Sequence, residues 1–204
     1  ISGRPSLGSW LSYGLGSVNR NLPEFVVLVC VGRGVPGGSA SWSSGFLPSH
    51  HSGVMFRNEG TPVLNLDLPA GVTAGMQRRT ITGVNELNAL RQAEAADPEI
   101  ESRIAAYELA FRMQTASPEL MDLSGETQET LDLYGVNRAE PKAPGGNPLG
   151  GTGLFGTFAR NCLMARRLVE RGVRVVQVWH QGWDHHQDIQ TRLTAKAEIG
   201  RAHV

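Results

Sequence analysis

An unbroken apolar run at 25–31, FVVLVCV, constrains the fold of this chain more than any other feature of its sequence, and Gly32 ends it. A strand without polar alternation is typical of a sheet buried on both faces, as in parallel sheets. A second valine-rich run, VRVVQVW, occupies 173–179. Two such runs, each preceded by a helical segment, predict an α/β fold whose parallel strands are flanked by helices.

Helical signals fill much of the sequence between the two runs. One helix is predicted over 79–95, and a second begins with Asp97 as N-cap and Pro98 at its first position. Its apolar face is predicted to contain Ile100, Ile104, Tyr107 and Phe111. Residues 75–140 therefore form a mainly helical insertion or cap between strands of the sheet.

The best-patterned helix is predicted over 155–171, directly before the second valine-rich run. Gly172 is expected to end it as a C-cap glycine. Its apolar face is predicted to contain Phe158, Cys162, Ala165 and Val169. Both cysteines of the chain, Cys30 and Cys162, lie in apolar segments, so we interpret them as buried thiols.

Weaker signals mark the remaining segments. Ser6 is an N-cap candidate for a glycine-containing helix, and Pro118 is expected to restart a short helix. Residues 62–66 could form a short strand. The segments 32–57 and 137–153 have the glycine and proline content of loops.

Composition excludes several classes of partner. The chain has 204 residues, of which 40% are hydrophobic, enough for one domain with a real core. Lysine plus arginine and aspartate plus glutamate both number 19, so no excess of positive charge favours nucleic acid or an anionic membrane. The longest apolar run is far too short to span a bilayer.

The clearest candidate site is a His/Asp cluster directly after the second valine-rich run. The segment HQGWDHHQD contains His180, Asp184, His185, His186 and Asp188. Ligands of open α/β sheets bind beyond the carboxyl ends of strands, and imidazole with carboxylate suits Zn²⁺ or Mn²⁺. The competing interpretation is a polar surface loop, because the spacing lacks the regularity of a helical metal motif.

Three residues elsewhere are candidates for contact with an oxyanion or substrate. His50 and His51 form a second histidine pair in LPSHHSG, and Arg4 lies in GRPS. Each has an alternative interpretation as an exposed loop residue. The serines before Gly45 and Gly125 lack the context of a nucleophile elbow, and Gly32-Arg33-Gly34 lacks the rest of a dinucleotide fingerprint.

Long ordered blocks of the chain resemble domain-of-unknown-function family 1501, a sulfatase-like family with an alkaline-phosphatase-type core. They include GRPSLGSWLSYGLGS, SGFLPSHHSGVMFR, DPEIESRIAAYELAFRMQTASPELMDLSGE and FARNCLMARRLVERGVRVVQVWHQGWDHH, and extend to about His186. The resemblance implies metal-dependent hydrolysis of sulfate or phosphate esters, on a small-molecule or polymer substrate. It also implies an exported, periplasmic protein. The alternative is a non-catalytic exported binding or assembly protein with the same fold.

The family's WDxH block implies metal ligands at Asp184 and His186, with His180 just ahead of them. The implied cofactor is a divalent metal, zinc first, with manganese or calcium as alternatives. We expect residues 1–197 to be part of one alkaline-phosphatase-like domain truncated at both ends, so that this piece alone is inactive. Residues 198–204, EIGRAHV, match the translation of a sequencing-library adapter and are expected to be a non-native tail.

Overall fold

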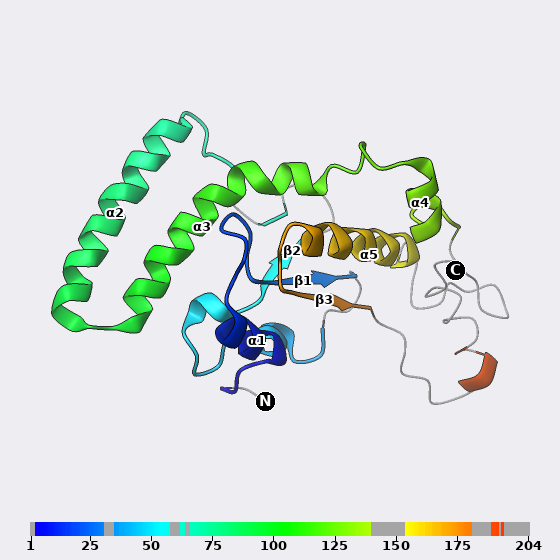
Figure 1. The fold of residues 1–204 in the computed structure, drawn as a ribbon, viewed down its shortest axis with the longest axis horizontal. Coiled ribbons are helices and arrows are strands. Elements are labelled where there is room, and N and C mark those ends of the chain that lie inside the picture. The colour runs from blue at the N-terminus through cyan, green and yellow to red at the C-terminus, as the bar shows by residue number, and fades with distance from the viewer. Residues whose placement is uncertain are drawn as a thin grey trace.

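A computed structural model describes residues 3–30, 35–57, 62–63, 66–139, 154–180, 189–191 and 193. Its strands are β1 (Phe25–Val29), β2 (Val54–Phe56) and β3 (Val175–Trp179). Its helices are α1 (Leu7–Leu15), α2 (Ala74–Ala95), α3 (Pro98–Met121), α4 (Gln128–Tyr134) and α5 (Leu154–Glu170), with 3-10 turns η1 (Gly38–Trp42) and η2 (Ser49–His51). Figure 1 shows the small sheet between α5 and α1, with the α2–α3 hairpin extending to one side.

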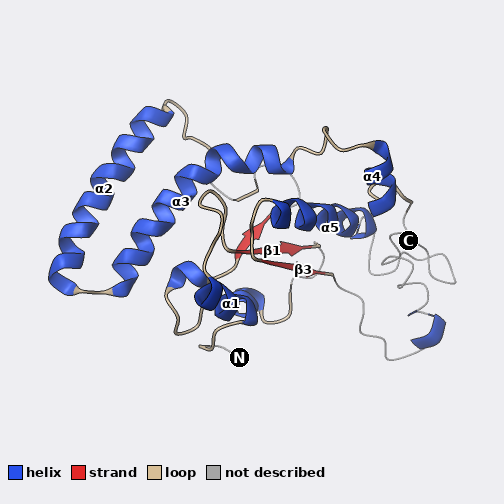
Figure 2. Ribbon diagram, viewed as in Figure 1, coloured by secondary structure: helices blue, strands red, loops and turns tan. Residues whose placement is uncertain are grey.

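The sheet is parallel, as the two valine-rich runs predict. Its order is β2-β1-β3, so β1 is hydrogen-bonded on both sides. Val26 of β1 pairs with Val54 of β2 and with Val176 of β3. The amino ends of the three strands therefore lie together on one side of the sheet, here called its amino edge. The carboxyl ends lie together on the opposite side, here called its carboxyl edge (Figure 2).

Both faces of β1 are buried, because helices or loops cover each of them. Val26 and Leu28 belong to the main core, together with residues of α3 and α5. Phe25 and Val27 point to the opposite face, where they lie close to Gly53, and Phe25 also contacts α1. This alternation explains why the strand has no polar positions.

The helix α1 turns its smallest residues towards the sheet. Ser6 caps it by accepting a hydrogen bond from the Ser9 amide at 3.2 Å, as predicted. Gly8 lies directly on the Phe25 ring, since a Cβ added there would be 2.4 Å from ring atoms. The larger apolar residues of α1 are exposed; the Trp10 side chain, for example, packs edge-on against Phe46 instead of entering the core.

The helix α5 confirms the predicted unit before β3, with one correction. It ends as expected before Gly172, whose φ of +86° is the left-handed conformation that favours glycine. The buried face is offset from the predicted one, because Val169 is 57% exposed. The buried residues of α5 are Leu154, Phe155, Ala159, Asn161, Leu163, Met164, Arg167 and Leu168. The offset arises because α5 packs against α3 and α4 as well as against the sheet.

The two longest helices form an antiparallel hairpin. The predicted caps Asp97 and Pro98 begin α3, and α2 begins at Ala74, five residues before its predicted start. The predicted restart at Pro118 is wrong, because α3 continues through that proline to Met121. Proline lacks an amide proton, but Pro118 lies in the last turn of α3, where the loss of one helical hydrogen bond does not end the helix. Figure 1 shows α3 changing direction well before this last turn. Among the described helices, none is long and apolar enough to span a bilayer.

The segment predicted as loop contains the strand β2. Only three residues of β2 pair with β1, and a run this short, directly after Gly53, has no recognisable strand pattern in the sequence. The strand suggested at 62–66 is not observed in the described part of that range, where Pro62 and Val63 form a bend. Residues 140–153, most of the later predicted loop, lie outside the described residues.

The close approach of Gly8 to Phe25 gives a test of this packing. We expect Gly8→Ala to lower the free energy of unfolding by about 1–3 kcal/mol, because the added methyl must displace a buried ring. The matched control is Gly14→Ala in the same helix, where no atom lies within 4 Å of an added Cβ. That variant should gain about 0.5–1 kcal/mol from helix propensity. Urea unfolding measures both, and equal effects would contradict the packing.

Candidate functional site

The predicted site begins where β3 leaves the sheet. The Cys30 amide donates a hydrogen bond to the Trp179 carbonyl at 2.9 Å, so the ends of β1 and β3 lie side by side. His180 is the next residue. It therefore occupies the carboxyl edge of a parallel sheet, where α/β proteins bind their ligands.

The helix α5 supports His180 from one side. The imidazole ring lies 4.7 Å from the Phe158 ring, with an angle of 30° between the ring planes. The His180 residue is half-buried. Stacking against a helix-borne aromatic ring restricts the rotation of the imidazole and holds it near the strand end.

The prediction of two buried thiols is confirmed for Cys30 and only in part for Cys162, which is on α5. Cys30 is buried, and the Asn161 side-chain amide donates to its sulfur at 3.5 Å. Cys162 is partly buried, and its burial raises the pKa of the thiol. A raised pKa leaves less thiolate, which makes Cys162 a poor nucleophile.

The other predicted ligands, Asp184 and His186, lie outside the described residues, as do His185 and Asp188. Within the described ranges, no group of three or more His, Cys, Asp or Glu residues could hold a metal ion. The metal-ligand set of Asp184, His186 and His180 therefore stays a prediction from the sequence. His180 is the one member of this set that lies within the described residues. Two imidazoles and a carboxylate are a donor set that zinc accepts, so the residue types fit the implied ion.

The histidine pair at 50–51 lies at the opposite edge of the sheet. It precedes β2, while His180 follows β3. The Ser12 hydroxyl donates to Glu24 Oε2, and Ser12 Oγ lies 2.8 Å from His51 Nδ1. Because the serine proton goes to Glu24, His51 Nδ1 is the donor in its bond to Ser12. This contact ties α1, β1 and η2 together at the amino edge.

The Ser12–His51–Glu24 cluster lacks the geometry of a nucleophilic triad. Serine and carboxylate approach the same nitrogen, since Glu24 Oε2 is 3.5 Å from His51 Nδ1. A triad needs them on opposite nitrogens of the ring. Ser12 is also fully buried, so no substrate reaches its oxygen. The arrangement acts as a buried polar anchor.

The surroundings of His51 favour its neutral form. Burial lowers the pKa of His51, and the neighbouring His50 lowers it further, while Glu24 acts in the opposite direction. The two histidine rings lie 3.9 Å apart, which explains the influence of His50. A neutral imidazole is the form that donates one proton to Ser12 without carrying a charge into the interior.

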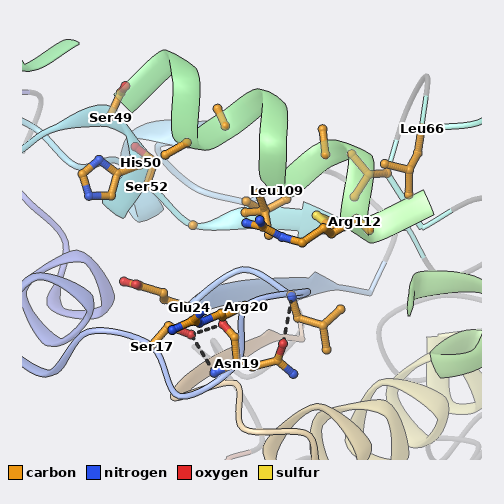
Figure 3. A pocket seen from close by; sticks show the side chains of 18 residues that line it. Ser17, Asn19, Arg20, Glu24, Ser49, His50, Ser52, Leu66, Leu109 and Arg112 are labelled. Carbon is orange, nitrogen blue, oxygen red and sulfur yellow. Dashed lines mark hydrogen bonds between the residues drawn. The ribbon is translucent and has the colours of Figure 1, made fainter. Parts of the chain in front are cut away.

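His50 contacts α3 and not a strand end. Its Nδ1 lies 2.9 Å from Ser102 Oγ, and the neighbouring Ser49 hydroxyl donates to Glu99 at 2.7 Å. These bonds fasten the start of α3 to η2, close to the cleft shown in Figure 3. Arg4 lies apart, exposed before α1, with its backbone packed against Gly45. The structure thus brings His50 and His51 together and places His180 at the other edge.

Sequence reasoning missed the partners of the amino-edge cluster. Ser12 and Glu24 are 39 and 27 residues from His51, and no periodic pattern links them. The one available signal is Glu24 itself, an acidic residue directly before a fully apolar strand. Such a charge requires a partner when the strand is central.

These features define an α/β protein with a parallel sheet and with His180 at the carboxyl end of β3. The family model described as "Protein of unknown function (DUF1501)" matches residues 1–201, and the chain belongs to this family. No curated protein and no solved structure matches it. The family resemblance is thereby confirmed, and the sulfatase-like relationship stays a prediction.

The lowered pKa of His51 predicts a dependence of stability on pH. As pH falls through the ordinary histidine value of 6.5, the unfolded chain binds a proton before the folded chain does. The free energy of unfolding should therefore decrease below about pH 6.5 and level off once folded His51 is protonated. Urea midpoints of wild type and His51→Gln between pH 5 and 8 measure this; an identical slope in the variant would contradict it.

Proposed function

We propose that this chain is part of an exported metal-dependent hydrolase of phosphate or sulfate esters. Asp184 and His186 are the proposed metal ligands, with His180 as a third. Zinc is the proposed ion, and small-molecule or polymer esters are the proposed substrates. The position of His180 at the carboxyl edge, beside the end of the central strand, is the observation that supports this proposal.

The chemistry follows from the donor types. A divalent ion polarises an ester oxygen or lowers the pKa of a bound water. The protein's own contribution here is to orient a ligand. His180 is held by the end of β3 on one side and by the Phe158 ring on the other, so its direction is set by rigid elements. Ligands fixed in this way need little reorganisation when the ion binds.

A second candidate is an exported binding or assembly protein that has the fold without the chemistry. The projecting α2–α3 hairpin favours it, because Leu87 and Leu90 on α2 are 64% and 67% exposed. Exposed leucines on one helix suit contact with another protein. The two candidates differ in whether the segment after β3 binds metal.

Metal content decides between the candidates. Protein expressed from the complete open reading frame should bind zinc. Asp184→Ala and His186→Ala should each weaken zinc affinity, and each loss should exceed a range of about 10- to 100-fold. That is the loss typical of removing a mere supporting residue, so removal of a direct ligand should exceed it. Competition with a chromophoric chelator measures the affinity.

The matched control is His50→Ala at the other edge of the sheet. Its zinc affinity should equal that of wild type, because its described contacts are with Ser102 and His51. Unchanged affinity in both Asp184→Ala and His186→Ala would contradict the hydrolase proposal and favour the binding protein.

A further inference from the structure

An open cleft of about 460 Å³ lies between α3 and the chain segments that precede β1 and β2, and His180 is not among its lining residues. One wall is α3, and the other is the segment between α1 and β1 together with the start of β2 (Figure 3). Its volume lies within the range of about 300–1,000 Å³ of small-molecule sites. The apolar part of its lining includes Leu22, Val54, Val63 and Leu66, together with Leu109 and Met113 of α3.

Positive charge predominates at the walls of this cleft. Among the described residues that line it, Arg20 and Arg112 carry positive charge and Glu24 carries the one carboxylate. Glu24 already accepts the Ser12 proton and lies near His51, so its charge is partly satisfied. Figure 3 shows Arg112 on the α3 side and Arg20 on the opposite side of the gap.

Neither arginine has a strong ion-pair partner among the described residues. Arg112 Nη1 is 3.9 Å from Glu108 Oε2, an oxygen that accepts a shorter bond of 2.8 Å from Arg78. The Nε of Arg112 is buried and lacks a hydrogen-bond partner in the described structure. The Arg112 side chain is nevertheless 39% exposed, so its terminal nitrogens have donors left for an acceptor that enters the cleft.

The loop that carries Arg20 is held in a fixed shape. The Asn19 side-chain oxygen accepts hydrogen bonds from the amides of Asn21 and Leu22, at 2.6 and 3.2 Å. The Asn19 side-chain amide donates to the Arg171 carbonyl behind it. The backbone at Arg20 is therefore preorganised, which reduces the entropy lost when its guanidinium binds an anion.

We propose that this cleft binds an organic anion with a short apolar group. The guanidinium groups of Arg112 and Arg20 bind the anionic head, and the apolar part of the lining accepts the tail. Arginine suits carboxylate, sulfate and phosphate heads alike, since its planar fork presents two donors to two oxygens. This proposal does not depend on the proposed hydrolase function, because none of the described residues that line the cleft is a proposed metal ligand.

Calorimetric titration with three probes tests the ligand class. Hexanoate carries both the anion and the apolar group, hexan-1-ol carries only the apolar group, and inorganic sulfate carries only the anion. We expect hexanoate to bind at least about tenfold more tightly than either of the others. No binding of hexanoate, or equal binding of hexanoate and hexan-1-ol, would overturn the proposal.

Variants locate the site. Arg112→Ala and Arg20→Ala should each weaken hexanoate binding about five- to tenfold, as expected for loss of a partly exposed charged hydrogen bond. Arg103→Ala is the matched control, an exposed arginine on α3 that does not line the cleft. Circular dichroism checks the fold of each variant, and Arg20→Ala serves alone if Arg112→Ala is unfolded. Equal hexanoate affinities of Arg20→Ala and Arg103→Ala would contradict the proposed location of the binding site.

Discussion

The burial of β1 on both faces is the constraint on which the rest of the described fold depends. Its residues Phe25 to Leu28 are at most 1% exposed, and each buried side chain of this size contributes about 1.5–3 kcal/mol. Burial on two faces requires two covering layers, which α5 with α3 and α1 with its neighbouring loops supply. The backbone of β1 is hydrogen-bonded along both sides of the strand, which requires the two partner strands β2 and β3.

The parallel arrangement then separates two chemically different edges. At the amino edge, the strand begins at Glu24, whose charge is satisfied by Ser12 and His51. These contacts are buried and hold elements in place. At the carboxyl edge, the chain leaves the sheet at His180 with further imidazoles and carboxylates following in sequence. His50 and His51 thus form an anchoring pair, whereas His180 and His186 belong to the proposed metal-binding group.

Much of the fold follows from local signals in the sequence. The apolar runs predict β1 and β3, while Ser6, Asp97 and Gly172 mark helix boundaries that the structure confirms. The missed features depend on non-local contacts. Three residues of β2 pair only because β1 lies beside them, and the burial of α5 is set by the helices it meets.

The candidate site is also predictable only in part from the sequence. A His/Asp cluster after a buried strand indicates the carboxyl edge, and the structure places His180 there. The role of His51 depends on residues far away in the sequence, which no spacing rule connects. The same holds for the cleft, whose two arginines come from a loop before β1 and from α3.

The separation of the two edges is the central claim, and a paramagnetic titration tests it most directly. Mn²⁺ added to isotope-labelled protein should broaden the amide signals of Cys30 and His180, at the carboxyl ends of β1 and β3. The amide signals of Glu24 and His51, at the amino edge, should stay sharp at the same Mn²⁺ concentration. Selective broadening at Glu24 and His51, or equal broadening at both edges, would contradict the account.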